Sequence, residues 1–161
     1  MRRAARQRWL VLGIAAALLM LAVLQYLHDR ARAPGTLLGI DPTSITAVTL
    51  DMAGKPPERY RRRNGHWWGE HGQRADDGRL DDLAGIAAAP VAGWRPAGNF
   101  DLAKIGLAPP LAQLQLDDRT IEFGTTAVTG PLRYVRVGER IALVPLRYTP
   151  RPAAKDAERI H

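Results

Sequence analysis

The stretch LAQLQLDDRTIEFG, residues 111–124, consists of two short apolar alternations on either side of Asp117-Asp118. Apolar residues at every second position are typical of β-strands that bury one face, and paired aspartates between such runs indicate a turn. The stretch therefore predicts an antiparallel hairpin over a hydrophobic core. With a two-residue turn, the shared face carries Ala112, Leu114 and Leu116 opposite Phe123, Ile121 and Arg119.

Similar patterns lie on both sides of this hairpin. Downstream, LRYVRVGERIALVP (132–145) predicts a second hairpin. We expect a three-residue loop, Gly138-Glu139-Arg140, because a two-residue loop would divide the apolar residues between both faces. With the longer loop, one face carries Val135, Val137, Ile141 and Leu143. Upstream, SITAVTLDM (44–52) predicts a strand whose buried face carries Val48, Leu50 and Met52.

The stretch RYRRRNGHWWGE (59–70) predicts a third hairpin. Asn-Gly between two extended runs is a strong hairpin signal, because a type I′ turn needs positive φ at both central residues. The two-residue register places Tyr60, Arg62 and Trp67 on one face, which we expect to belong to the fold. The other face is our candidate interaction surface: Arg59, Arg61, Arg63, His66 and Trp68. Solvated arginines that protect a sheet edge are the alternative interpretation of this face.

One helix is expected between these strands. In ADDGRLDDLAGIAAAP (75–90), Leu80, Leu83, Ala84 and Ala87 recur at helical spacing. Asp76 or Asp77 can cap the first turn, and Pro90 can end the helix. A short strand around VAGW (91–94) can follow. The sequence thus predicts an α+β domain over residues 37–146, a mostly antiparallel β-meander with one packed helix, followed by a loosely held C-terminal tail, 147–161.

The charge of the chain is uneven. Of the formal net charge of +7, residues 1–35 contribute six arginines and Asp29, or +5, and the remaining 17 basic and 15 acidic residues contribute +2. The domain is therefore nearly balanced, and we expect no nucleic-acid partner. The absence of cysteine excludes disulfides, thiolate zinc sites and cysteine nucleophiles.

The N-terminal charge surrounds an apolar run. Residues 9–27, WLVLGIAAALLMLAVLQYL, contain Gln25 as their one strongly polar side chain. About twenty such residues cross a bilayer as a helix, so we expect a transmembrane anchor at 9–27, a basic cytoplasmic N-terminus at 1–8 and a linker at 28–36. A cleaved signal peptide is the alternative, since Ala31-Arg32-Ala33 matches the small-x-small cleavage pattern, but the apolar run is longer than is usual for one.

The flanks of this run predict its orientation. Four arginines precede it, whereas Arg30 and Arg32 follow it beside Asp29. Cytoplasmic flanks carry the excess of basic residues. We therefore expect a single-pass protein of the bacterial inner membrane, with the N-terminus in the cytoplasm and the domain in the periplasm or another extracytoplasmic space.

A family resemblance accompanies these patterns. The segments GIDPTSITAVTL, NGHWWGE, RADDGRLDDLAGIAAAPVAGW, FDLAKIGLAPPLAQLQLDDRTIEFG and LRYVRVGERIALVP follow one another in this order. Over about residues 37–146, the chain resembles the bacterial family catalogued as domain of unknown function 4340. The resemblance implies a membrane-anchored extracytoplasmic protein, and some family members are encoded beside ABC exporters of the gliding-motility type. It implies no catalytic residues.

Catalytic chemistry has weak support in the sequence. The one histidine–carboxylate cluster of the domain is His66, Glu70 and His71. Zinc hydrolases place two histidines four residues apart on a helix, whereas these are five apart on an expected strand and loop. The paired aspartates are explained by caps, a solvated helix face and a turn. We predict no catalytic residue, no metal site and no cofactor.

Three function classes follow from the sequence. The leading one is a non-enzymatic, membrane-anchored interaction module, an accessory of a cell-envelope or ABC-transporter-type complex with a protein partner. The second is a module that binds anionic lipid or another polyanion through the Arg/Trp hairpin at 59–70. The third is a metal-dependent hydrolase.

Overall fold

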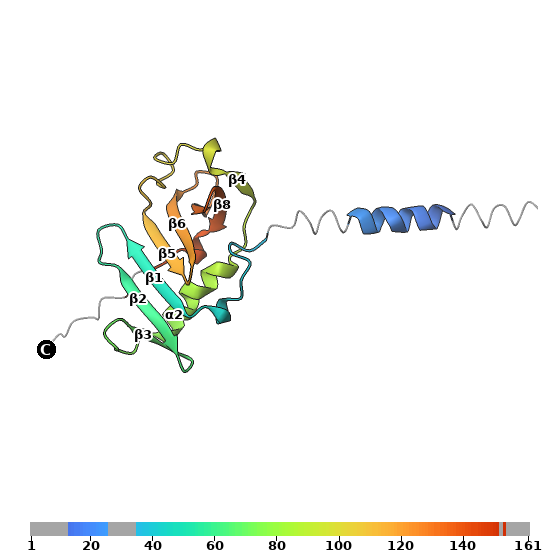
Figure 1. The fold of residues 1–161 in the computed structure, drawn as a ribbon. Helices are drawn as coiled ribbons and strands as arrows, with labels where there is room; N and C mark the ends of the chain where they lie inside the picture. The colour runs from blue at the N-terminus through green and yellow to red at the C-terminus, as the bar shows by residue number, and fades with distance from the viewer. Residues whose placement is uncertain (1–12, 26–34, 152, 154–161) are drawn as a thin grey trace, which may run out of the picture. The chain divides into compact units, whose positions relative to one another are not determined.

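A computed structural model describes residues 13–25, 35–151 and 153 of the 161-residue chain. The chain divides into two compact units, Met1–Ala33 and Pro34–His161. The second unit is the α+β domain that the sequence predicts, with a single antiparallel sheet and a packed helix (Figure 1).

Eight strands form the sheet, in the order β3-β2-β1-β5-β6-β7-β8-β4, and every neighbouring pair is antiparallel. Most neighbours follow one another in the chain, as in a meander. The exceptions are β1 beside β5, which joins strands β1–β3 to strands β5–β8, and β8 beside β4, which adds β4 as an edge strand. The strands are β1 Ala47–Met52, β2 Glu58–Arg63, β3 His66–Gly69, β4 Trp94–Pro96, β5 Ala112–Leu116, β6 Arg119–Thr126, β7 Leu132–Val137 and β8 Arg140–Pro145.

Helix α2, Asp77–Gly85, packs on one face of the sheet. Asp76 caps it by accepting a hydrogen bond from the backbone N–H of Arg79 at 3.2 Å, as the acidic start of the segment predicts. Leu80, Leu83 and Ala84 are buried against the sheet, because their spacing brings them to one side of the helix. Short 3-10 turns occur at Pro42–Ser44, Ile86–Ala88, Ala97–Asn99 and Leu146–Tyr148.

Two of the three predicted hairpins have the expected register. Asn64 and Gly65 have φ of 51° and 78°, and Arg63 pairs with His66 across their turn. Leu116 likewise pairs with Arg119 across Asp117-Asp118. The buried residues of both hairpins join the main core: Trp67, Leu114, Leu116, Ile121 and Phe123.

The third hairpin corrects our prediction of a three-residue loop. Val137 pairs with Arg140, so the loop is the two-residue Gly138-Glu139. Val135 therefore faces the main core together with Ala142 and Val144, while Ile141 faces the other side. The apolar residues do divide between both faces, because the connector between β4 and β5 covers the second face. It buries Ile141 in a smaller cluster with Ala97 and Leu107, against which Phe100, Leu102, Ile105 and Tyr134 pack.

The first residues of the predicted C-terminal tail, 147–151, pack against the domain. Tyr148 packs against the main core, and Pro150 is buried. The carbonyl oxygen of Arg151 accepts a hydrogen bond from Arg79 at 3.1 Å, and the backbone N–H of Ala153 donates to Glu58 at 3.2 Å. Residues 147–151 therefore belong to the domain, since their apolar side chains cover part of its core. Residue 152 and residues 154–161 lie outside the described part of the chain.

The predicted anchor, 9–27, lies within the first unit. Residues 13–25 are helical, and their large apolar side chains are exposed. The cytoplasmic segment 1–8, both ends of the 9–27 span and linker residues 28–34 lie outside the described residues. Within 13–25, 35–151 and 153, no helix combines the length and the apolar character needed to cross a membrane.

Candidate interaction surface

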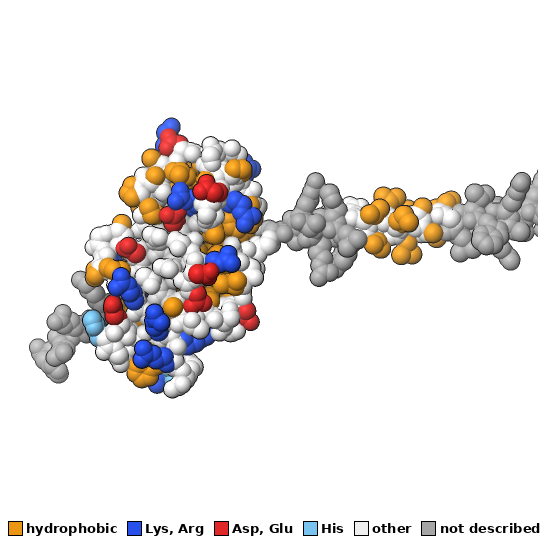
Figure 2. Space-filling model, viewed as in Figure 1, with side chains coloured by type: hydrophobic (Ala, Val, Ile, Leu, Met, Phe, Trp, Pro, Cys, Tyr) orange, Lys and Arg blue, Asp and Glu red, His pale blue; other side chains and the backbone are white. Residues whose placement is uncertain are grey.

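The β2–β3 hairpin separates its side chains as the register predicts. Arg59, Arg61 and Arg63 are exposed, while Glu58, Tyr60 and Arg62 alternate with them and are half-buried. Opposite them, Trp67 is completely buried and Trp68 is half-buried. Because adjacent residues of a strand point to opposite sides, one strand supplies both a structural face and an exposed basic face. Figure 2 shows Lys and Arg side chains gathered at the end of the domain that β2 and β3 form.

The exposed face lines a groove of about 270 Å³. Four residues of the candidate surface contribute to it: Arg59, Arg61, Arg63 and Trp68. Five further residues line the groove and were not predicted as part of the surface: Ala47, Thr49, Tyr60, Gly69 and Glu70. Thr49 pairs with Arg59 across β1 and β2. The contribution of Thr49 depends on the β1–β2 register. A five-residue connection, 53–57, sets this register, and no local turn motif predicts it.

The groove has an excess of positive charge. Arg59 forms an ion pair with Glu70 at 3.4 Å, in which both side chains are more than half exposed (58% and 55%). Such an exposed pair contributes little to stability. Arg61 and Arg63 form no ion pair within the described residues. Two guanidinium groups next to an indole ring can therefore bind an anionic group by charge or a planar group by stacking.

The inner face of the hairpin holds it against α2. The Arg62 guanidinium contacts the Asp81 carboxylate, donates to the carbonyl oxygen of Thr43 at 3.1 Å and lies 4.8 Å from the centre of the Trp67 ring. The indole N–H of Trp67 donates to Asp81 at 2.9 Å. Since the polar groups of buried aromatic residues need partners, Arg62 and Trp67 have structural roles.

A second ion pair on the inner face, between Glu58 and Arg79, joins β2 to α2, and Glu58 also contacts the C-terminal segment. Arg79 donates to Glu58 at 2.6 Å, and Tyr60 donates to the same carboxylate at 2.9 Å. Burial raises the pKa of Glu58, but the hydrogen bonds from Arg79, from Ala153 N–H and from Tyr60 together hold this pKa below its ordinary value. Glu58 is therefore charged at neutral pH and anchors the strand.

His66 differs from the other predicted surface residues. Its Nδ1 lies 2.7 Å from the Asp77 carboxylate and 2.8 Å from Arg74 Nη2, so the ring engages the start of α2. A single ring nitrogen cannot donate to Asp77 and accept from Arg74 at the same time. Hydrogen bonds from Trp67 N–H and from His66 hold the pKa of Asp77 well below its usual range, and Arg74 adds to this effect. His66 thus stabilises the contact between hairpin and helix and does not line the groove.

The residues considered for a metal site do not come together. His66 contacts Asp77, and His71 is exposed. No group of three His, Asp or Glu side chains positioned to hold a metal ion occurs in the part of the chain that the structure describes.

Comparisons of the chain with protein-family models, with curated proteins and with solved structures found no match. The family resemblance stays a prediction.

Proposed function

We propose that this chain is a membrane-anchored binding module of the bacterial cell envelope, with no catalytic role. In this proposal, residues 9–27 cross the inner membrane with the N-terminus in the cytoplasm, and the α+β domain acts outside the cytoplasm. The helical conformation of residues 13–25 and the exposure of their large apolar side chains support an anchor. The bias of arginine to the N-terminal flank supports the orientation.

The observation that carries the binding function is the exposed face of the β2–β3 hairpin. Three exposed arginines lie at alternate positions of one strand, and within the described residues only Arg59 has an acidic partner. The hydrophobic core requires none of them, because the opposite side of the strand makes the contacts to α2. We infer that this face docks on an acidic surface of a protein partner in the envelope. The resemblance to the family with exporter-linked members favours an ABC-transporter-type complex.

Anionic lipid headgroups or another polyanion are the second candidate partner. The groove beside Trp68 favours it, because a cluster of arginines next to an indole suits a phosphate group at a membrane surface. Both candidates depend on the same three arginines, so the same variant tests both.

The variant is Arg59→Glu/Arg61→Glu/Arg63→Glu in the full chain. Its matched control is Lys104→Glu/Arg95→Glu/Arg119→Glu, which reverses three other exposed cations. Each chain is crosslinked in membranes and its partners are identified by mass spectrometry. Binding to phosphatidylglycerol vesicles is measured in parallel as a function of salt. Melting temperatures verify that both variants fold.

A protein crosslink lost only in the hairpin variant supports the docking function. Salt-sensitive vesicle binding that is lost only in this variant supports the anionic-lipid function. If the hairpin variant keeps every interaction of the wild-type chain, both candidates are wrong.

A further inference from the structure

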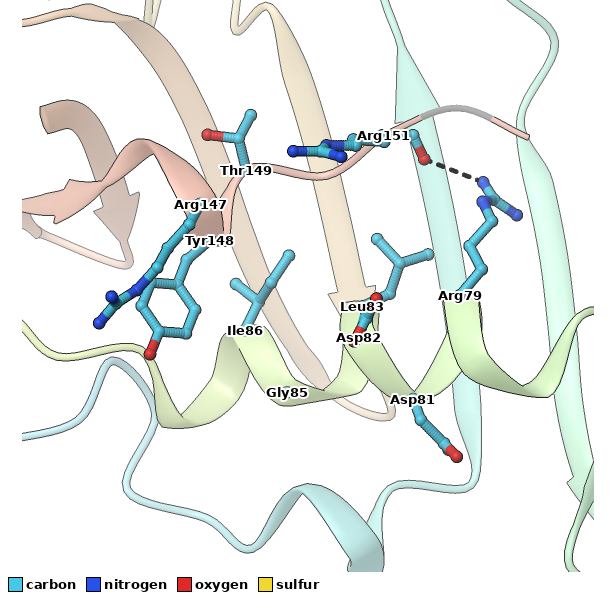
Figure 3. A pocket seen from close by; sticks show the side chains of 10 residues that line it. All are labelled: Arg79, Asp81, Asp82, Leu83, Gly85, Ile86, Arg147, Tyr148, Thr149 and Arg151. Atoms are coloured by element: carbon cyan, nitrogen blue, oxygen red, sulfur yellow. Dashed lines mark hydrogen bonds between the residues drawn. The ribbon is translucent and has the colours of Figure 1, made fainter. Parts of the chain in front are cut away.

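Two hollows of the domain differ in what a ligand can reach. One lies between α2 and the segment that follows β8 (Figure 3). Its residues Leu83 and Ile86 are each 3% exposed, and the Thr149 hydroxyl is shielded from solvent, so a ligand there cannot contact these groups. The other, which we call the β4 cavity, has a volume of about 350 Å³ and includes residues of β4 and β8.

The apolar lining of the β4 cavity is accessible. The rings of Phe100 and Tyr134 meet edge to face with their centres 6.0 Å apart, and both residues are half-exposed. Leu143, which pairs with Tyr134 across β7 and β8, is half-exposed as well. An aromatic side chain placed against these three residues would be removed from water and would meet aromatic rings, both of which are favourable.

The backbone of β4 is open on the side away from β8. β4 is the last strand of the sheet (Figure 1), and Ala97 N–H donates to the Glu139 carbonyl oxygen at 2.9 Å. Residues of an antiparallel pair alternate between those that exchange hydrogen bonds and those that do not. Counting back from Ala97, Arg95 therefore bonds to β8, and Trp94 directs its N–H and carbonyl oxygen outward. Neither group of Trp94 has a partner outside the sheet within the described residues.

This open edge is short and selective. Pro96 has no N–H, so Trp94 is the residue of β4 that offers both a donor and an acceptor to an added strand. A short edge with a proline resists indiscriminate pairing. An added strand is thereby restricted to one register, in which one of its residues lies opposite Trp94.

The neighbours of Trp94 determine which side chains such a strand needs. Gly93 and Arg95 both line the β4 cavity, since alternate residues share a face. Arg95 is exposed and forms no ion pair in the described part of the chain. A Cβ atom on Gly93 would meet nothing within 4 Å, so the space over this residue is open. Aromatic side chains of a neighbouring strand cover such edge glycines well.

We propose that β4 binds an extended segment of a partner protein, which adds an antiparallel strand with the pattern acidic–any–aromatic. The middle residue exchanges two hydrogen bonds with Trp94. The acidic residue before it lies opposite Arg95. The aromatic residue after it lies over Gly93 and contacts the rings of Phe100 and Tyr134. The antiparallel direction follows the rest of the sheet.

The β4 cavity shares no lining residue with the hairpin groove, so this binding site is independent of the proposed function. The control variant of the charge-reversal experiment contains Arg95→Glu. A crosslink that is lost only in that control therefore belongs to β4, whereas a crosslink lost only in the hairpin variant belongs to the hairpin.

The probe is the peptide Thr-Val-Glu-Thr-Phe-Val-Thr, with a fluorophore at its N-terminus and an amidated C-terminus. It is titrated into the full chain in a neutral detergent, and fluorescence anisotropy gives the Kd. Leucine methyl NMR locates the peptide. Leu143 reports on the β4 cavity, and Leu114, which is completely buried in the main core, is the reference. We expect saturable binding and a shift at Leu143 that exceeds the shift at Leu114.

Backbone pairing is tested with N-methylated peptides. A methyl group on the nitrogen of the central threonine removes the hydrogen bond to the Trp94 carbonyl oxygen, and we expect it to weaken binding about tenfold. The matched control carries the methyl group on the adjacent phenylalanine, whose N–H points away from β4 in the proposed register. This control should bind nearly as well as the unmodified peptide.

A charge exchange tests the contact with Arg95. We expect Arg95→Glu to weaken binding about fivefold, and a peptide with lysine in place of glutamate to recover the loss. Arg119→Glu lies in the β5–β6 turn outside the cavity and should leave both affinities unchanged. Melting temperatures verify that both variants fold.

Four results would overturn the proposal. The first is the absence of saturable binding at millimolar peptide, and the second is an equal shift of Leu143 and Leu114. The third is an equal loss of affinity for the two N-methylated peptides, and the fourth is a variant Arg95→Glu that does not distinguish glutamate from lysine. Dimers of the chain that dissociate when the peptide is added would assign the edge to a second copy instead.

Discussion

Asp117 is a turn residue that also joins two distant parts of the sheet. With φ of 51° it lies in the left-handed region, which aspartate tolerates better than most residues. Its carboxylate accepts hydrogen bonds from Ala47 N–H at 2.8 Å and from the Thr46 hydroxyl at 2.9 Å. The β5–β6 turn thereby fixes the start of β1, which is about seventy residues earlier in the chain.

We expect Asp117→Ala to lower the free energy of unfolding by about 2 kcal/mol, because the half-buried N–H of Ala47 and the exposed donors of Thr46 lose their common acceptor. Asp117→Asn should have a smaller effect, since an amide oxygen can still accept and asparagine tolerates the same φ. Asp118→Ala is the control: its side chain is 86% exposed and makes one loose ion pair. Urea denaturation measures all three, and equal losses for Asp117→Ala and Asp118→Ala would contradict this role.

Asp77 gives the domain a defined sensitivity to acid. The pKa of the folded state lies below the value of about 3.9 expected in an unfolded chain. The stabilisation is therefore complete above that value and is lost as the pH falls toward the pKa of the folded state. We expect the difference in urea midpoint between the wild-type chain and Asp77→Asn to be constant near neutral pH and to shrink below about pH 4. A difference that does not change with pH would show that the carboxylate charge makes no contribution.

At the scale of elements, Gly124 in β6 allows the β4–β5 connector to cross the sheet. A Cβ atom at this position would lie 2.2 Å from the Ile105 carbonyl oxygen and 3.0 Å from Leu107 Cγ. The same carbonyl accepts a hydrogen bond from Thr125 N–H at 2.8 Å. This close approach brings Ile105 and Leu107 to the second cluster around Ile141, at the point where the register of β6 with β7 shifts between Phe123 and Thr126.

We expect Gly124→Ala to destabilise the domain by about 1–3 kcal/mol, because the connector backbone would have to move. Gly85→Ala is the matched control at the end of α2. Gly85 has ordinary helical dihedral angles, and a Cβ atom there would meet nothing within 4 Å. It should therefore stabilise the domain by about 0.5–1 kcal/mol. Thermal or urea unfolding measures both, and two effects of the same sign would contradict this account.

At the scale of the whole molecule, the proposal assigns the two units to different environments. We expect an alkaline phosphatase fused after residue 161 to be active, because this enzyme folds with its disulfides only outside the cytoplasm. A fusion that replaces the chain after Arg8 should be inactive. The complementary fusion uses a reporter that is active only in the cytoplasm. If this reporter is active when it is fused after residue 161, the domain does not leave the cytoplasm.

The local features of the fold could be predicted from the sequence. The strand faces around Asn64-Gly65 and Asp117-Asp118 and the capped helix depend on residues that are close in the chain, so turn chemistry and periodicity are sufficient. The separation of Trp67 from the exposed arginines is of this kind, since two strands joined by a two-residue turn have one register.

Only the tertiary structure decided how these pieces meet. The pairing of β1 with β5, the two-residue loop at Gly138-Glu139 and the contact of His66 with Asp77 all depend on segments distant in sequence. The loop prediction failed because it assumed a single buried face, whereas the connector provides a second one. The cavity beside Thr149 depends on residues 147–151 packing along α2, and no turn motif or hydrophobic period encodes such a contact.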